Sequence, residues 1–145
     1  MVWSAGAGGG NPARTYGLDR DAAIRSMDAA SAAWVRRYVM VSYFGAGPDH
    51  GVAQSDPFFA YADAKSAADA HLRAGGLDWT IVAPSTLTLD EPSGRIDAAA
   101  SAAGTVSRGD VAAVVAAVLA DPATAGRTIR FNSGDTPVAE ALGHS

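Results

Sequence analysis

The 145 residues are 48% hydrophobic and 18% charged, contain no cysteine and carry a formal net charge of −4. This composition predicts one globular domain and excludes a disordered chain, disulfide bonds, thiolate catalysis and cysteine-ligated metal sites. The acidic balance, together with the lack of a basic stretch or of an apolar run near ~20 residues, argues against nucleic acid and membranes as partners.

Short apolar runs alternate along the chain with segments of helical periodicity. In chain order we expect strand 2–5, helix 19–34, strand 37–42, helix 57–73, strand 78–83, helix 108–120, strand 128–132 and a short helix from residue 136, with irregular segments at 44–56 and 85–105. Asp19 and Ser107 are the predicted N-caps of the first and third helices, and Ser107 forms a capping-box-like pair with Asp110. Pro57 suits the first turn of the second helix, which Gly75 ends.

The alternation of strands and helices predicts an α/β fold. Its core is a parallel sheet of about four strands with right-handed crossovers and flanking helices on both faces, because strands this apolar must be covered on both sides. Strand 2–5 is expected at one edge of the sheet. Its unpaired N–H and C=O groups would be open there, so we expect self-association through this edge or poor solubility.

The sharpest chemical signal is the pattern Tyr61-x-x-x-Lys65 on the second predicted helix, with Ser42 at the end of the strand before it. The spacing places Tyr61 and Lys65 on one helix face. A nearby ammonium favours the phenolate form of a tyrosine, whose ordinary pKa is about 10. Ser42, at the carboxyl end of a parallel strand, would hold a substrate oxygen while Tyr61 transfers a proton.

Other interpretations of these residues stay open. A Y-x-x-x-K pattern also arises by chance, and Tyr61 is equally consistent with a half-buried packing residue. Lys65 and Asp69 are four residues apart as well, which is typical of a surface ion pair. The pattern by itself therefore leaves catalysis and packing as alternatives.

The glycine-rich segments and the histidines carry weaker signals. Residues 6–11 and 45–51 each follow a predicted strand, but neither is expected to lead directly into a helix, as a phosphate-binding loop does. We expect plain loops at both places. His50, His71 and His144 are too scattered to predict a metal site, and no Ser-His-Asp order or G-x-S-x-G elbow is present.

Six segments cover nearly the whole chain: VWSAGAGGG, LDRDAAIRSMDAA, RRYVMVSYFGA, YADAKSAADAHLRAGGLDWTIVAPSTLT, SRGDVAAVVAAVLADPATAGRTI and SGDTPVAEAL. Together and in this order they resemble atypical short-chain dehydrogenase/reductases, and most closely the NAD(P)-binding proteins of the NAD-dependent epimerase/dehydratase-like group. The resemblance implies a Rossmann-like sheet, of which residues 1–145 would form the C-terminal portion of a single domain. The family begins with a G-x-x-G-x-x-G loop and further βα units, so roughly 60–80 residues would be absent.

The resemblance also implies roles for individual residues. Ser42, Tyr61 and Lys65 match the family's catalytic positions. Cofactor contacts are implied for Ala5, Gly6, Ala7, Lys65, Pro84, Ser85 and Leu87. The first three of these would lie near the adenosine ribose, and the last three would border the nicotinamide. The segment Pro-Ser-Thr-Leu at 84–87 departs from the family's more usual Arg-Pro-Gly-Gly-Leu type.

We therefore expect an NAD(P)-dependent oxidoreductase or epimerase-like protein in truncated form, with a small-molecule substrate and no metal. The alternative is a non-catalytic NAD(P)-binding regulatory module or an inactive fragment. NADP or NAD is the implied cofactor of the complete family domain. Weak or no binding is expected for this chain, because its sequence lacks the loop that holds the phosphates. Residues 1–10 lack the features of a signal peptide, so a cytoplasmic location is expected.

Overall fold

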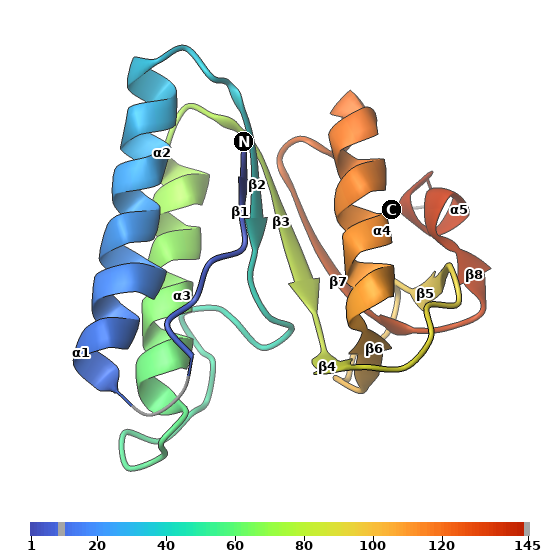
Figure 1. Cartoon of the computed structure of the whole chain (residues 1–145), viewed down its shortest axis with the longest axis horizontal. Helices are drawn as coiled ribbons and strands as arrows, with labels where there is room; N and C mark the ends of the chain where they lie inside the picture. The colour runs from blue at the N-terminus through green and yellow to red at the C-terminus, as the bar shows by residue number, and fades with distance from the viewer. Residues whose placement is uncertain (9–10, 144–145) are drawn as a thin grey trace.

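Four parallel strands form the centre of the fold (Figure 1). The computed structural model describes residues 1–8 and 11–143. In spatial order the strands are β1 (Val2–Trp3), β2 (Arg37–Val41), β3 (Asp78–Pro84) and β7 (Arg127–Ser133), each parallel to its neighbour. This arrangement confirms the predicted α/β fold and places β1 at the edge of the sheet.

Short strands extend the sheet beyond the four that the sequence predicts. Within the described residues it has six strands in the order β1-β2-β3-β7-β5-β8, because β5 (Arg95–Asp97) pairs antiparallel with both β7 and β8 (Thr136–Pro137). A separate parallel pair joins β4 (Thr86–Thr88) to β6 (Thr105–Ser107). The helix expected from residue 136 begins one short strand later, as α5 (Val138–Gly143). Such short strands are fixed by distant partners, so they leave no local apolar pattern.

Helices cover both faces of the sheet, as expected (Figure 1). α2 (Ala23–Ala32) and α3 (Phe59–Ala74) pack on one face, and α4 (Arg108–Ala120) packs on the other. Successive residues of β2 face opposite sides, because Met40 belongs to the core under α2 and α3 whereas Val39 belongs to the core under α4. The strand is therefore apolar throughout because each face has its own core.

The first helical segment begins earlier than the sequence predicts. α1 (Pro12–Thr15) continues through a π-helical segment (Tyr16–Ala22) into α2. Its N-cap is Asn11, whose side-chain oxygen accepts a hydrogen bond from the Arg14 N–H (3.2 Å). The pair of a capping asparagine and a proline at the first helical position is the stronger start signal. The prediction of Asp19 as an N-cap is wrong, since Asp19 lies buried inside the helical segment.

The surroundings of this helix also differ from the predictions. Asn11, the last residue of the glycine-rich segment 6–11, caps a helix that begins at Pro12, so the expectation of no helix directly after this segment is wrong; Gly9 and Gly10 lie outside the described residues. Segment 45–51 is irregular, as expected. At the other end the helix stops at Ala32, and Trp34, expected on the helix, adopts a left-handed φ of 62° in an exposed position.

The second predicted helix, α3, keeps its expected end but not its expected start. It begins at Phe59 rather than at Pro57, because the Asp56 carboxylate accepts from the Phe58 N–H (2.8 Å) and closes a turn before the helix. Gly75 follows its last residue, as predicted. None of the described helices combines the length and the apolar character needed to cross a membrane.

Asp110 fixes the start of α4 against the loop before β5. The Ser107 hydroxyl accepts from the Asp110 N–H (3.0 Å), which confirms the predicted cap. The buried Asp110 carboxylate in turn accepts from the N–H groups of Ser93 (3.1 Å) and Gly94 (2.8 Å). Burial alone would raise the pKa of this carboxyl, but the hydrogen bonds outweigh burial and hold the pKa below its ordinary value.

The substitution Asp110→Asn should lower the free energy of unfolding by roughly 1–2 kcal/mol at neutral pH, because an amide turns an N–H donor toward N–H donors. A carboxyl with a depressed pKa stabilises the fold above its unfolded-state pKa and loses that effect as the pH falls through the folded-state value. Urea unfolding at pH 7 and at about pH 3 checks this. The difference between wild type and variant should shrink at the lower pH, and an equal difference at both would contradict the assignment.

Self-association through the free side of β1 stays a prediction. Among the described strands β1 pairs only with β2, so its outer N–H and C=O groups have no sheet partner there. Light scattering at increasing protein concentration should show a mass above that of the monomer, and Val2→Lys should lower that mass because a charge blunts an edge strand. A monodisperse monomer at high concentration would contradict the prediction.

Candidate active site

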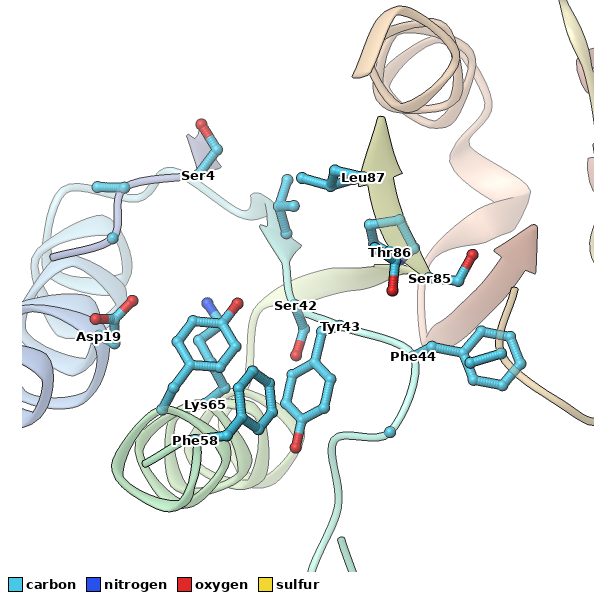
Figure 2. Close-up of a pocket in the computed structure, with 17 residues that line it drawn as sticks. Ser4, Asp19, Ser42, Tyr43, Phe44, Phe58, Lys65, Ser85, Thr86 and Leu87 are labelled. Carbon is cyan, nitrogen blue, oxygen red and sulfur yellow. The ribbon is translucent and has the colours of Figure 1, made fainter. Parts of the chain in front are cut away.

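A cavity of about 590 Å³ opens where β1, β2 and β3 end (Figure 2). The carboxyl ends of parallel strands meet at one edge of a sheet, and this is where such sheets bind ligands. The residues predicted from the sequence that line the cavity are Ala5, Gly6, Ser42, Tyr61, Lys65, Pro84, Ser85 and Leu87. Ala7 is the exception, because it lies outside the lining and its N–H donates to the Asp19 carboxylate (3.2 Å).

Asp19 is a part of the site that the sequence analysis assigned differently. It lines the cavity from the π-helical segment and is 2% exposed. A Cβ on Gly6 would lie 3.1 Å from its Oδ1, so the loop after β1 approaches the carboxylate more closely than a larger residue would comfortably allow. Asp19 thus fixes the path of the loop that the resemblance places at the cofactor.

Ser42 follows β2 directly and is held by the sheet. Its N–H donates to the Val82 carbonyl of β3 (2.8 Å), and its side chain is buried. The hydroxyl donates to the Asp69 carboxylate (2.5 Å) and so does not offer its hydrogen freely to the cavity. The oxygen keeps its lone pairs as acceptors.

Lys65 is buried rather than paired at the surface. Its side chain lies on the face of α3 that packs on the sheet, where small residues such as Ala64 and Ala68 let the helix approach closely. It is 2% exposed, and its Nζ donates to the Met40 thioether (3.2 Å). Burial lowers the pKa of Lys65, whereas the charges of Asp69 and Asp19 act to raise it.

Tyr61 belongs to an aromatic wall of the cavity. Its ring centroid lies 5.4 Å from that of Tyr43 and 5.2 Å from that of Phe58. Burial raises the pKa of the Tyr61 phenol, and the carboxylates of Asp19 and Asp69 raise it further. The expected lowering of this pKa by Lys65 is therefore wrong, because the pKa lies above its ordinary value and the phenol keeps its proton at neutral pH.

Asp69 is the second acid that the sequence analysis missed as a part of the site. It is 1% exposed, so the expectation of a surface pair with Lys65 is wrong. Burial raises the pKa of its carboxyl, while the Ser42 hydrogen bond and the charge of Lys65 lower it. A signal was present in the sequence, since positions 61, 65 and 69 share one helix face, and a face that buries a lysine needs an acid nearby.

Neither His50 nor His71 lines this cavity. The His50 ring accepts a hydrogen bond from the Val52 N–H (3.0 Å). His71 lies at the surface, where its Nε2 is 3.0 Å from the Asp28 Oδ1. His144 lies outside the described residues. Within residues 1–8 and 11–143, no group of three or more His, Asp or Glu side chains could hold a metal ion.

Comparison with known proteins places this geometry in a family. The model of the NAD(P)H-binding family matches residues 1–122. A Bacillus subtilis (strain 168) protein named as an uncharacterized sugar epimerase, YhfK, is 35% identical over 145 residues, covering 98% of this chain and 66% of its own. A structure from Bacillus halodurans, assigned as an NAD-dependent epimerase/dehydratase, superposes with a TM-score of 0.90 at 30% identity, covering 99% of this chain and 68% of that one.

A second solved structure gives the same result. The oxidoreductase ylbE from Lactococcus lactis superposes with a TM-score of 0.88 at 29% identity, covering 99% of this chain and 65% of that one. The chain spans about two thirds of the length of the curated relatives that it matches, at 66%, 64% and 65%. By its sequence and by its Rossmann-like fold, the chain belongs to the NAD(P)H-binding family, among the atypical short-chain dehydrogenase/reductases.

Proposed function

We propose that the cavity binds the nicotinamide end of NAD(P)H and that Ser42, Tyr61 and Lys65 handle proton transfer in an oxidoreductase or epimerase reaction. One observation carries the proposal. Ser42, directly after β2, lines the same cavity as Tyr61 and Lys65 of α3, and the sequence singled out all three for acid–base chemistry. The family and its epimerase- and oxidoreductase-named relatives support it.

The buried polar atoms around the cavity fit the nicotinamide half of such a cofactor. Ser85 lines the cavity and its Oγ has no hydrogen-bond partner among the described residues. Lys65 has a thioether as the partner of its ammonium, which is a weak acceptor that leaves capacity for a ribose hydroxyl. The side chains of Phe58 and Leu87 give the cavity an apolar surface against which the planar nicotinamide ring would pack.

The cofactor, when bound, would supply hydride, so the protein's own task is to place the substrate and move a proton. Tyr61 carries its proton at neutral pH and is therefore ready to donate to a carbonyl oxygen that is being reduced. Ser42 offers an acceptor to a substrate hydroxyl, since its own hydrogen is held by Asp69. Lys65 would hold the ribose and stabilise negative charge on Tyr61 after the transfer.

The alternative is a non-catalytic NAD(P)-binding regulatory module or an inactive fragment. One observation favours it, because burial, together with the charges of Asp19 and Asp69, opposes the ionisation of Tyr61 that the reverse proton transfer needs. A binding-only site would tolerate such a phenol, whereas an enzyme that works in both directions must offset it in the complex.

Replacement of the Tyr61 hydroxyl separates these two functions. Tyr61→Phe should lower the rate of NADPH-dependent reduction of a carbonyl compound by at least ~100-fold, because it removes the proton donor. Product formation from a panel of aldehydes and ketones, at millimolar NADPH and followed by mass spectrometry, measures it. Tyr16→Phe is the matched control, since the Tyr16 hydroxyl donates to Asp63 (2.9 Å) and does not line the cavity. Equal turnover by Tyr61→Phe and wild type would refute the catalytic role.

We also propose that the 145-residue chain binds NADPH weakly. The charged side chains among the described lining residues are Asp19 and Lys65, and the sequence has no G-x-x-G-x-x-G loop for the pyrophosphate. Losing two or three charge-assisted hydrogen bonds of ~1.5–3 kcal/mol each should bring a micromolar site to roughly millimolar Kd. Calorimetric titration should give NADPH and nicotinamide riboside similar affinities. A low-micromolar Kd for NADPH alone would show that loop 6–11 or loop 45–51 holds the phosphates.

A further inference from the structure

Asp69 is a buried acid beside the cavity, and its part in the proposed proton transfer is so far limited to holding the Ser42 hydrogen. It lies one helical turn after Lys65 on α3 and is 1% exposed. Its Oδ2 accepts the hydrogen bond of the Ser42 hydroxyl (2.5 Å). One carboxylate thus joins the end of β2, at the hydroxyl of Ser42, to α3, where its charge acts on Lys65.

The second oxygen of this carboxylate is left without a partner. Asp69 Oδ1 is buried and accepts no hydrogen bond from the described residues. Asp110, which is equally buried at 1% exposed, shows the contrast, because its two oxygens accept from backbone N–H groups of Ser93 and Gly94. A residue that only anchored Ser42 would need a single acceptor, which an uncharged asparagine supplies. A buried carboxylate that lacks such hydrogen bonds is stabilised where a nearby cation offsets its charge.

Lys65 on the same helix is a cation whose charge acts on the Asp69 carboxylate. Its ammonium is buried against the Met40 thioether, and burial lowers its pKa. The carboxylates of Asp69 and Asp19 act in the opposite direction and favour the charged amine. Two further pairs of ionisable groups interact with Asp69. Its charge adds to burial in raising the pKa of the Tyr43 and Tyr61 phenols. The charges of Arg73 and Arg130 in turn lower the pKa of Asp69.

We infer that Asp69 is a positioning residue, which fixes the hydroxyl of Ser42 and keeps the buried Lys65 protonated. The inference rests on the proposed function, since Ser42 and Lys65 matter together only if the cavity transfers protons. An ionised Asp69 takes the Ser42 hydrogen and so directs that oxygen to the cavity as an acceptor. A protonated Lys65 is the form that donates hydrogen bonds to ribose hydroxyls and stabilises a phenolate.

The chain offers a direct measurement, because Lys65 is the only lysine in the sequence. Lysine labelled with ¹³C at Cε gives one side-chain NMR signal, whose pH dependence follows protonation of Nζ. Asp69→Asn keeps an acceptor for Ser42 and removes the charge. It should move the Lys65 midpoint to lower pH and raise the neutral fraction of the amine, at a fixed pH below the midpoint, about tenfold or more.

Two further variants separate charge from structure. Asp69→Glu keeps the charge on the same helix face and should leave the Lys65 midpoint close to that of wild type. Asp110→Asn should weaken the fold without moving the midpoint, because Asp110 lies in the separate cap of α4. An unchanged midpoint in Asp69→Asn overturns the inference, and so does an equal displacement in Asp110→Asn.

The wild-type titration decides the matter if Asp69→Asn does not fold. The Lys65 signal should then show a second inflection at acidic pH as Asp69 takes up a proton, and this inflection should persist in Asp19→Asn. Its absence overturns the inference. None of these measurements uses cofactor or substrate, so a lack of turnover counts against the proposed function alone, and an unmoved Lys65 midpoint counts against the role of Asp69 alone.

Discussion

The site depends on the parallel register of β1, β2 and β3. Met40 is aligned with Trp3 on one side and with Ile81 on the other, so the three strands run in register toward the same edge of the sheet, where β3 continues to Pro84. The chain then leaves each strand at the same edge, and the residue after β2 is still held by the sheet through the Ser42 N–H to the Val82 carbonyl. A side chain positioned by sheet hydrogen bonds is placed more firmly than one on a free loop, which suits chemistry that needs a fixed geometry.

Burial of one cation organises the rest of the site. The ammonium of Lys65 loses most of its hydration, and the Met40 thioether returns little of what water supplied. Asp69 on the same helix and Asp19 on the neighbouring segment offset this loss. Burial raises the pKa of Tyr61, and the negative charges of Asp19 and Asp69 raise it further. The same two acids therefore act to raise the pKa of both side chains, which favours the charged amine and the uncharged phenol.

The long, local patterns in the sequence predicted most of the fold, and long-range contacts account for what was missed. Strand 37–42 was predictable because each of its faces meets a separate apolar core. The α4 cap was predictable because Ser107 and Asp110 interact within one turn. β5 and β8 depend on pairing across distant segments, which no local pattern records. The cluster of Tyr61 and Lys65 was found by spacing, but the burial of Asp69 depends on how closely the helix packs on the sheet, which spacing alone does not give.

Asp19 links the two halves of the site, and its role shows why the local prediction failed there. As a presumed cap it would have served only its own helix, but the helix already has Asn11 as its cap, which leaves the Asp19 carboxylate to face the cavity. One of its oxygens accepts from the Ala7 N–H in the loop after β1, while its charge acts on Lys65 and Tyr61. The position of that loop and the protonation of the two side chains are thus coupled through a single carboxylate. Under the function proposed above, a ligand that shifts this loop would therefore also change the electrostatic field at Lys65 and Tyr61.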